Sequence, residues 1–376
     1  MRIVITTAGS RGDVAPYTGL AQRLNAAGHR TVIATHEPFR PMVEAHGIEF
    51  AGLAADPREI LGSEAGRRWQ AASGLTSAVR MVGLMRPYAR EMAERALAAT
   101  EGADLILCST LTAANYHTAK GRGIPTMGVF LQPLEPTREF SSVLTGGVRS
   151  YGAWGNRASA ATSAALLAVP FMAEVNNARN RLGLPSTSYR RLRHELAETR
   201  WPVAYGFSRH LVPRPADWRP GLDVVGYWWP DPDPTWTPST ELLDYLAAGD
   251  PPVLLGFGSM AAGTGDAKRL ADVAVTALRS VGARGILQAG WSGVAAQADG
   301  RGDVLSIGEA PHDWLLPRVP AVVHDGGAGT PTADRLAFAL RQVLHVPSYR
   351  ANAQALAARV AEEDGAGAVF TAVARL

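Results

Sequence analysis

The residues that follow the first apolar segment of the chain combine a carboxylate with glycines and a serine. Gly9-Ser10-Arg11-Gly12-Asp13-Val14 comes directly after the apolar residues 2–7 and opens a helical pattern. A carboxylate at the end of a strand can take a proton from a hydroxyl nucleophile, so Asp13 is a candidate general base. Asp13 could instead cap the helix, with Gly9 and Gly12 supplying only turn geometry, and the two roles are compatible.

Two further glycine-containing loops have the composition of anion sites. Gly256-Phe257-Gly258-Ser259 follows an apolar run, so backbone amides can approach a phosphate and Ser259 can donate to it, although a plain tight turn explains the same residues. The sharper pattern is His324-Asp325-Gly326-Gly327-Ala328-Gly329-Thr330, where an apolar strand enters a glycine-rich loop that opens a helix. The amides and the helix dipole of such a loop suit a diphosphate, whereas close packing of helix on strand is the structural alternative.

Aromatic and polar residues precede the second of these loops. His312 and Trp314 lie in the segment Pro311-His312-Asp313-Trp314-Leu315, where they could stack on a nucleotide base and form hydrogen bonds with it. Taken singly, each is more typical of a protein core. A structural role is also the interpretation of the scattered histidines His29, His36, His46 and His117.

Apolar runs alternate with helical patterns along the chain, and this alternation must position the candidate groups. Strands are predicted at residues 2–7, 31–35, 104–108, 126–130, 252–257, 285–289, 304–307 and 321–324. Such alternation favours parallel sheets with helices on both faces, which is a doubly wound α/β fold. Ligands of that architecture bind beyond the carboxyl ends of the strands, where the three loops begin.

A change of composition divides the chain into two parts. Residues 211–238 carry seven prolines interleaved with four tryptophans, which indicates a stiff interdomain linker. The expected organisation is therefore an N-terminal domain over residues 1–215, a linker over 216–240 and a C-terminal domain over 241–376. Two α/β domains joined in this way are expected to hold a ligand cleft between them.

Composition excludes several classes of function. With 37 Lys and Arg against 34 Asp and Glu among 376 residues, the formal charge is only +3, so nucleic-acid binding by a basic stripe is not expected. The single cysteine, Cys108, excludes an intramolecular disulfide or a multi-thiolate metal site and fits a reducing compartment, here the cytoplasm. The longest apolar stretch, residues 158–172, is shorter than the ~20 residues of a membrane span, so no span is expected.

Taken together, the motifs resemble those of the GT-B-fold nucleotide-sugar glycosyltransferases that modify macrolide, glycopeptide and other antibiotic aglycones, and sterols. The resemblance covers most of the chain. It is carried by Gly9-Ser10-Arg11-Gly12-Asp13-Val14, Ala27-Gly28-His29, Phe207-Ser208, Pro213-Arg214-Pro215-Ala216-Asp217-Trp218, Gly226-Tyr227-Trp228, Gly256-Phe257-Gly258-Ser259-Met260, Pro311-His312-Asp313-Trp314-Leu315 and Gly326-Gly327-Ala328-Gly329-Thr330.

The resemblance implies two Rossmann-like domains facing a cleft, and metal-independent, inverting transfer of a hexose-type sugar from a nucleoside diphosphate to a hydroxyl of a hydrophobic natural product. Asp13 matches the proposed base of the family, with Ser10, Arg11 and Gln132 on the acceptor side. The implied donor-binding residues are Ser259, Trp291, His312, Trp314, His324, Gly326, Gly327, Ala328, Gly329 and Thr330. The expected partners are the nucleotide-sugar donor and the acceptor, without a further cofactor, and a homodimer is left open.

Two features depart from the family pattern. Asp325 stands where the family usually has a second histidine, and a carboxylate near phosphate oxygens repels them. After Thr330, roughly 45 residues of the usual C-terminal domain have no counterpart, including a strand-helix segment and the sugar-binding acidic residue and glutamine. The alternative hypothesis is therefore a non-catalytic relative that binds a ligand or partner and has a degraded donor site. A nucleotide-sugar epimerase or a phosphorylase is a third reading.

Overall fold

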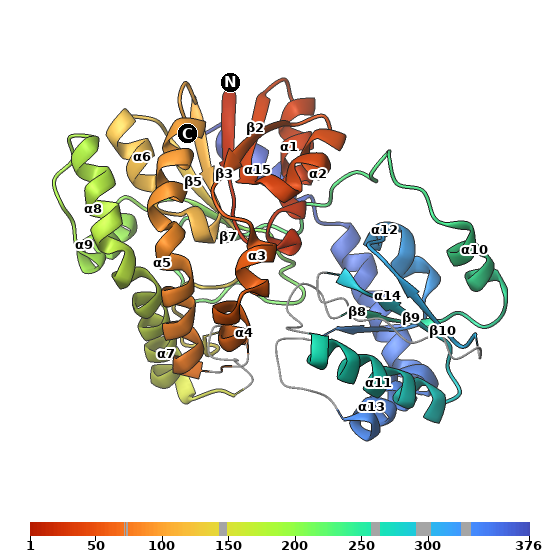
Figure 1. Ribbon diagram of the computed structural model, residues 1–376. Coiled ribbons are helices and arrows are strands. Elements are labelled where there is room, and N and C mark those ends of the chain that lie inside the picture. The colour runs from red at the N-terminus through yellow and green to blue at the C-terminus, as the bar shows by residue number, and fades with distance from the viewer. Residues whose placement is uncertain (71, 73, 143–148, 257–263, 291–301, 325–331) are drawn as a thin grey trace. The chain divides into compact units, whose positions relative to one another are not determined.

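The computed structural model describes residues 1–70, 72, 74–142, 149–256, 264–290, 302–324 and 332–376. Contacts divide the chain into two compact units. The first contains Met1–Ile60, Ala72–Asp231 and Arg359–Leu376, and the second contains Leu61–Ala71 and Pro232–Ala358. Each unit is built on its own parallel β-sheet, so the two-sheet α/β architecture predicted from the alternation of apolar runs is confirmed (Figure 1).

The first unit is a doubly wound sheet with the strand order β3-β2-β1-β4-β5-β6-β7. All neighbouring strands in it are parallel. The strands are β1 (Arg2–Thr6), β2 (Arg30–His36), β3 (Glu49–Leu53), β4 (Leu105–Cys108), β5 (Thr126–Phe130), β6 (Val203–Tyr205) and β7 (Leu222–Val224). The longer helices are α1 (Ala15–Ala26), α2 (Arg40–Ala45), α3 (Pro57–Gly62), α5 (Gly74–Ala99), α6 (Asn115–Arg122), α7 (Gly152–Ala168), α8 (Met172–Arg181), α9 (Tyr189–Glu198) and α15 (Gly365–Val373).

Successive side chains of each strand are buried on opposite faces of this sheet, because side chains alternate with a two-residue period along a strand. Ile3 and Ile5 of β1 belong to a core cluster that also contains residues of α1 and α15. Val4, between them, belongs to a second cluster with Ala96 of α5. Both faces are therefore covered, which explains why these strands are apolar at consecutive positions.

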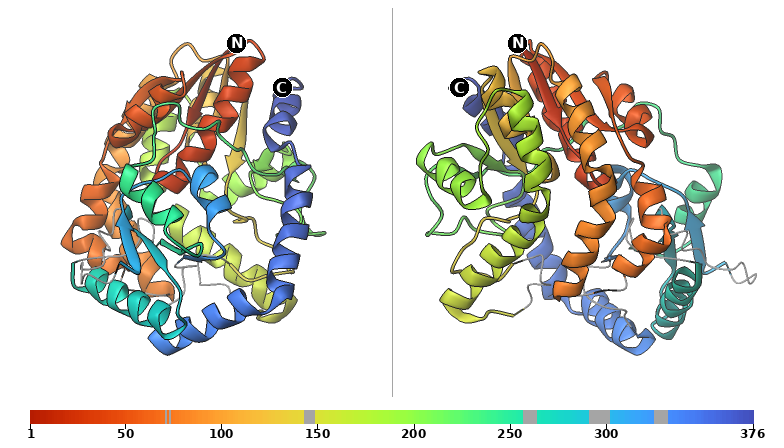
Figure 2. Two further views of the ribbon diagram at one scale, coloured as in Figure 1. Left: turned by 90° about the vertical axis from the view of Figure 1, so that its right-hand side faces the viewer. Right: turned by 60° about the vertical axis from the view of Figure 1, so that its left-hand side comes forward.

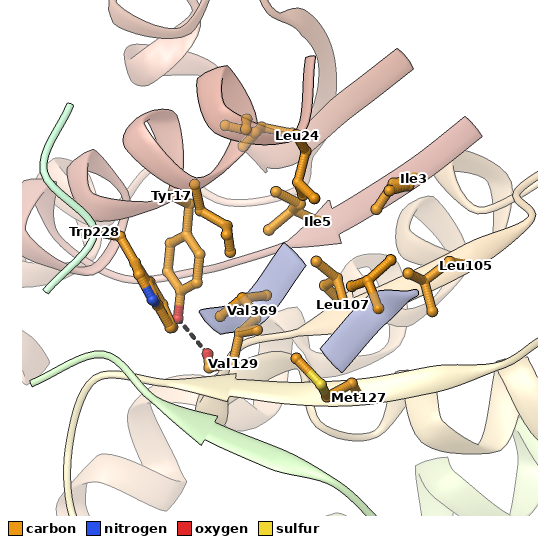
Figure 3. Packing of buried hydrophobic residues seen from close by; sticks show 14 of the residues in the cluster. Ile3, Ile5, Tyr17, Leu24, Leu105, Leu107, Met127, Val129, Trp228 and Val369 are labelled. Atoms are coloured by element: carbon orange, nitrogen blue, oxygen red, sulfur yellow. Dashed lines mark hydrogen bonds between the residues drawn. The ribbon is translucent and has the colours of Figure 1, made fainter. Parts of the chain in front are cut away.

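A buried hydrogen bond links α1 to β5 inside the first cluster. The Tyr17 hydroxyl donates to the Val129 carbonyl at 2.7 Å (Figure 3). The Trp228 ring lies 5.5 Å from the Tyr17 ring, centroid to centroid, and is only 1% exposed. These contacts fix α1 against strand β5 of the sheet. The Asp13 segment leaves the same sheet at the end of β1.

The proline- and tryptophan-rich segment differs from the expected linker over residues 216–240. Its first part contains strand β7, and Trp218 and Trp228 are buried in the cores of the first unit. Only the part that begins at Pro232 belongs to the second unit. The physical reason is that burying a large indole side chain is strongly favourable, whereas a solvated linker would leave it in water.

The C-terminal residues also differ from the expected boundary of 241–376, because Arg359–Leu376 belong to the first unit. Val369 and Val373 of α15 are buried in the core cluster that contains α1, and Figure 3 shows Val369 there. In Figure 2 the C-terminal helix, in dark blue, lies on the same unit as the N-terminus. Gly365 lies so close to the Gly226 carbonyl oxygen that a Cβ there would be 2.3 Å from it. The division between the units falls within α14 (Pro347–Ala361), and the chain continues from it to α15.

The second unit has a smaller parallel sheet with the strand order β10-β9-β8-β11. Its strands are β8 (Val253–Gly256), β9 (Gly285–Gln288), β10 (Val304–Ile307) and β11 (Val322–His324). Its helices are α4 (Glu64–Gln70), α10 (Thr240–Ala247), α11 (Thr264–Ser280), α12 (His312–Leu315), α13 (Ala333–His345) and most of α14. Strand β11 lies at an edge of the four-stranded sheet, and its Val322 is 45% exposed.

One helical segment of the first unit is apolar enough to resemble a membrane span. Gly152–Arg181 contains an 18-residue window with a mean hydropathy of 1.4, of which 11% is buried. By length and composition alone the segment could cross a membrane, and it is less buried than the core helix of a soluble protein. The segment is longer than the apolar stretch recognised in the sequence because α7 continues through a short 3-10 helix into α8.

Candidate active site

The first candidate site is built by residues 9–13, hereafter the Asp13 loop, at the carboxyl end of β1. Asp13 Oδ2 accepts hydrogen bonds from the Ser10 backbone N–H at 2.8 Å and from Ser10 Oγ at 3.0 Å. Asp13 therefore binds back to the residue that precedes the short 3-10 helix Arg11–Asp13, as an acidic residue in a first helical turn commonly does. Asp13 does not cap α1 as considered from the sequence, because the N-cap residue of α1 is Val14 and that helix has no side-chain cap hydrogen bond.

The other carboxylate oxygen of Asp13 faces a residue from a different strand. Gln132 Nε2 donates to Asp13 Oδ1 at 3.5 Å, a long hydrogen bond. Among the described residues no other hydrogen bond to this oxygen is found. The structure thus brings the expected base, Asp13, together with two of the residues expected on the acceptor side, Ser10 and Gln132, from the ends of β1 and β5. Arg11 begins the 3-10 helix and is exposed.

Gly9 makes this arrangement sterically possible. It has a φ of +125°, and a Cβ placed on it would lie 2.5 Å from Asp13 Oδ2. Any larger residue would therefore meet both the strain of a positive φ and the carboxylate itself. Gly9 is required here by the close approach of the Asp13 side chain as well as by the turn.

The side chain of His36 contacts the Asp13 loop through a backbone hydrogen bond. From the sequence, only a structural role was expected for this histidine. It ends β2, the strand next to β1, and is 2% exposed. The Gly9 N–H lies 3.2 Å from His36 Nε2, and His36 Nδ1 lies 3.0 Å from the Ala54 carbonyl oxygen. Burial lowers the pKa of His36 despite the opposing hydrogen bonds to backbone carbonyls and the nearby Asp56 and Asp13.

The C-terminal end of the Asp13 loop is also held by the sheet. Thr7 Oγ1 donates to the Asp13 carbonyl oxygen at 2.6 Å. Tyr17, one helical turn further along α1, is fully buried, and burial followed by the nearby Asp13 charge raises its pKa well above the usual range. The Tyr17 hydroxyl consequently stays protonated and keeps its donor contact to β5.

A cluster of small hydroxyl residues at the ends of β1 and β4 was not recognised in the sequence. Thr6 Oγ1 donates to Thr112 Oγ1 at 2.9 Å, and Thr112 Oγ1 donates to the Thr6 carbonyl at 2.6 Å. Ser109 Oγ lies 3.2 Å from Thr112 Oγ1. These bonds join the two central strands at the edge where the Asp13 loop begins. Their signal in the sequence is only a Ser/Thr-rich segment directly after a buried strand.

The second candidate site follows the carboxyl ends of the four strands of the second unit. Gly256, Gln288 and His324 end β8, β9 and β11, and the sheet register pairs Gly256 with both of the others. The predicted donor residues Ser259, Trp291, Gly326, Gly327, Ala328, Gly329 and Thr330 come after these strands in the chain but lie outside the described residues, as does Asp325. His324 itself is exposed at the end of the edge strand.

His312 and Trp314 lie on the short helix α12, which follows β10. Gln288 Nε2 donates to the Ala310 carbonyl at 3.1 Å and so connects the segment before this helix to the end of β9. His312 is exposed, whereas Trp314 is partly buried, with its ring 5.1 Å from the Trp236 ring and the Arg318 guanidinium carbon 4.1 Å from its centroid. Much of the Trp314 ring is thus engaged within the second unit.

Within the described residues, no group of three or more His, Cys, Asp or Glu side chains is arranged to hold a metal ion. Cys108 is buried and unpaired with another cysteine.

Comparison with known proteins identifies the family. Residues 3–103 match the glycosyltransferase family 28 N-terminal domain. The chain is also 36% identical over 379 residues to O-mycaminosyltylonolide 6-deoxyallosyltransferase of Streptomyces fradiae, an alignment that covers 93% of this chain and 81% of that enzyme. The chain belongs to glycosyltransferase family 28. The motifs of the sequence predicted a family of this kind.

The chain also resembles a plant sterol glucosyltransferase and a bacterial glycosyltransferase of known structure. It is 33% identical to a sterol 3-beta-glucosyltransferase of Arabidopsis thaliana over 88% of this chain and 54% of the plant protein, so it spans about half the length of that relative. Among solved structures, a Streptomyces sp. SF2575 glycosyltransferase complexed with thymidine diphosphate matches with a TM-score of 0.58 and 19% identity, covering 100% of both chains. The GT-B fold expected from the sequence is thereby confirmed.

Proposed function

We propose that this glycosyltransferase moves a sugar, with inversion at the anomeric carbon, from a nucleoside diphosphate to a hydroxyl of a hydrophobic natural product, with Asp13 as the general base. The observation that carries the proposal is the asymmetric bonding of the Asp13 carboxylate. Ser10 holds Oδ2, while the only described partner of Oδ1 is the 3.5 Å contact from Gln132. Oδ1 is therefore the oxygen suited to accept a proton from an incoming hydroxyl.

The proposed reaction needs one proton transfer and one displacement. As the acceptor oxygen approaches the anomeric carbon, its proton passes to Asp13 Oδ1. A new carbon–oxygen bond forms on one face of the sugar while the bond to the diphosphate breaks on the other, and the electron pair leaves with the nucleoside diphosphate. Gln132 is placed to direct the acceptor hydroxyl, because its amide nitrogen lies beside the same oxygen.

On the donor side, the proposal assigns the diphosphate to Ser259 and the loop Gly326–Thr330, and the base to His312 and Trp314. Support comes from the sequence pattern and from the relatives, one of which was solved with thymidine diphosphate. Amides at the start of a helix can stabilise the charge that develops on the departing diphosphate. Trp291 and His324 complete the proposed donor set.

The acceptor class is proposed as a hydrophobic polycyclic or macrocyclic alcohol. One relative acts on a tylonolide derivative and others on sterols by their names. An assay should therefore combine thymidine- and uridine-diphosphate sugars with both a macrolactone panel and a sterol panel, and detect products by mass. Glycosylation of macrolactones alone would support the natural-product assignment, and glycosylation of sterols alone would replace it with a sterol one.

The role of Asp13 is tested with Asp13→Asn, which keeps the hydrogen bonds from Ser10 but removes the basic oxygen. We expect kcat to fall by about 10²- to 10⁴-fold with little change in the thermal unfolding midpoint. The exposed Asp244→Asn on α10 is the matched control and should keep wild-type turnover. Unchanged turnover in Asp13→Asn would rule out Asp13 as the base.

A second candidate function, a non-catalytic binding protein, is favoured by Asp325, which would place a carboxylate beside the diphosphate loop. It predicts that nucleotides and sugars produce no product with any acceptor. In that case thermal stabilisation by a hydrophobic alcohol should persist without stabilisation by thymidine or uridine diphosphate. Substituting Asp325→His separates the two candidates, because only a glycosyltransferase would gain nucleotide affinity from it.

A further inference from the structure

We propose that His36 is a positioning residue, whose neutral ring holds the Asp13 loop in the geometry needed for proton transfer. The proposal rests on the function proposed above and adds a residue that neither the motifs nor the family resemblance single out. Its basis is the pair of backbone contacts that His36 makes on opposite sides of its ring.

The two partners determine a single state of the ring. A peptide N–H can only donate, so Gly9 requires a lone pair on His36 Nε2. A carbonyl oxygen can only accept, so Ala54 requires the proton on Nδ1. The neutral Nδ1–H tautomer satisfies both, whereas a doubly protonated ring would set a second N–H against the Gly9 N–H.

The surroundings of His36 favour this neutral state. The ring is buried by β2 and its neighbours, and burial is the dominant cause that lowers its pKa. The charged groups facing it are Asp13 from the loop and Asp56 from the segment after β3, and both act in the opposite direction. Burial prevails, so the neutral form of the ring is favoured.

Gly9 transmits the position of the ring to the catalytic carboxylate. The Asp13 carboxylate occupies the space where a Gly9 side chain would be, with Oδ2 only 2.5 Å from that Cβ position. The Asp13 carboxylate packs against the Gly9 peptide. If the Gly9 N–H loses its hydrogen bond to His36, this peptide can move and the carboxylate can move with it. A displacement of about 1 Å at a reacting group can lower the rate by roughly 100-fold.

Two amide substitutions of His36 test its contact with Gly9 and its contact with Ala54 one at a time. In His36→Gln the longer side chain can bring its Oε1 to the place of Nε2 and accept the Gly9 N–H. In His36→Asn the shorter amide can reach Ala54 but leaves Gly9 without an acceptor. His194→Asn, at a surface position on α9 that is 71% exposed, is the matched control.

The first readout does not depend on turnover. Nitrogen-15 NMR of protein labelled in histidine and glycine should show an unprotonated Nε2 for His36. The Gly9 amide should exchange with solvent faster in His36→Asn than in the wild type or in His36→Gln. A proton on Nε2, or equal Gly9 exchange in all three proteins, would overturn the proposal. This result stands even if no donor and acceptor pair is turned over, an outcome that would count against the proposed function instead.

The second readout is kinetic. We expect kcat to fall by roughly 10- to 100-fold in His36→Asn, with the donor KM changed less than about twofold, and to recover largely in His36→Gln. In an Asp13→Asn background, His36→Asn should lower the residual rate by less than about threefold, because the group it positions is already absent. Equal losses in the two amide variants, or a full additional loss in the Asp13→Asn background, would show that His36 only maintains the fold.

Discussion

The guanidinium of Arg179 lies 2.8 Å from the ring nitrogen Nδ1 of His117, and both side chains are buried. The pair joins α6 to α8, and Arg179 Nε also donates to the Pro185 carbonyl at 2.8 Å. Because the guanidinium is always charged, the His117 nitrogen that faces it must accept and the ring must be neutral. Burial, followed by the Arg179 charge, lowers the pKa of His117 to about 4.

This pair predicts a loss of stability in acid. The unfolded chain binds a proton at His117 near pH 6.5, whereas the folded chain binds it only near pH 4. The contribution of His117 to the free energy of unfolding is therefore complete above about pH 6.5. It decreases by about 3 kcal/mol as the pH falls to about 4. Urea unfolding of the wild type and of His117→Gln at several pH values measures it. The difference between the two free energies of unfolding should change over this range, and a constant difference would contradict the prediction.

The thiol of Cys108 should be unreactive in the folded protein. It lies at the end of β4, is fully buried, and burial raises its pKa to about 11. Both inaccessibility and the small thiolate fraction slow its reaction with a disulfide reagent, by roughly 100-fold or more relative to the unfolded chain. The measurement is the rate of colour release at pH 8 with and without denaturant. Rapid labelling under native conditions would show that β4 opens locally.

Gly9→Ala should lower both the turnover and the stability of the protein. The new methyl group would meet Asp13 Oδ2, so the carboxylate must move away from its partners at Ser10. We expect a decrease in kcat of roughly 10-fold or more and destabilisation of about 1 to 2 kcal/mol. Gly102→Ala is the control, since Gly102 also has a positive φ, of +66°, but has open space around its Cβ position. A comparable loss of turnover in both variants would point to backbone strain alone.

Helix α15 should contribute directly to the stability of the first unit. Val369 is 0% exposed in the core cluster with α1, so Val369→Ala should lower the free energy of unfolding by about 2 kcal/mol. Val79→Ala on α5, at a position 56% exposed, should change it by less than about 0.5 kcal/mol. Denaturant unfolding followed by tryptophan fluorescence is suitable because Trp228 lies in the same cluster. Equal effects of the two substitutions would mean that α15 is not firmly packed.

The agreement between sequence and structure is closest where the pattern is local. The strands expected at residues 126–130 and 304–307 occur as β5 (Thr126–Phe130) and β10 (Val304–Ile307), because a short apolar run bounded by turn residues leaves few alternatives. The linker and the C-terminal domain boundary in the structure differ from those expected from the sequence, because they depend on contacts between residues far apart in the chain. Whether Trp228 is solvated or buried depends on contacts with Tyr17, which lies far away along the chain.

What the sequence determined by itself is the alternation of strands and helices, the place of the Asp13 loop after the first strand, and the family to which these motifs belong, because each depends on neighbours within a few residues. Only the tertiary structure decided which distant groups meet that loop. Gln132 approaches Asp13 and His36 accepts from Gly9 because β1 lies between β2 and β4 in the sheet, with β5 next to β4. The order of strands follows from burial of the whole chain, and no local pattern of residues encodes it.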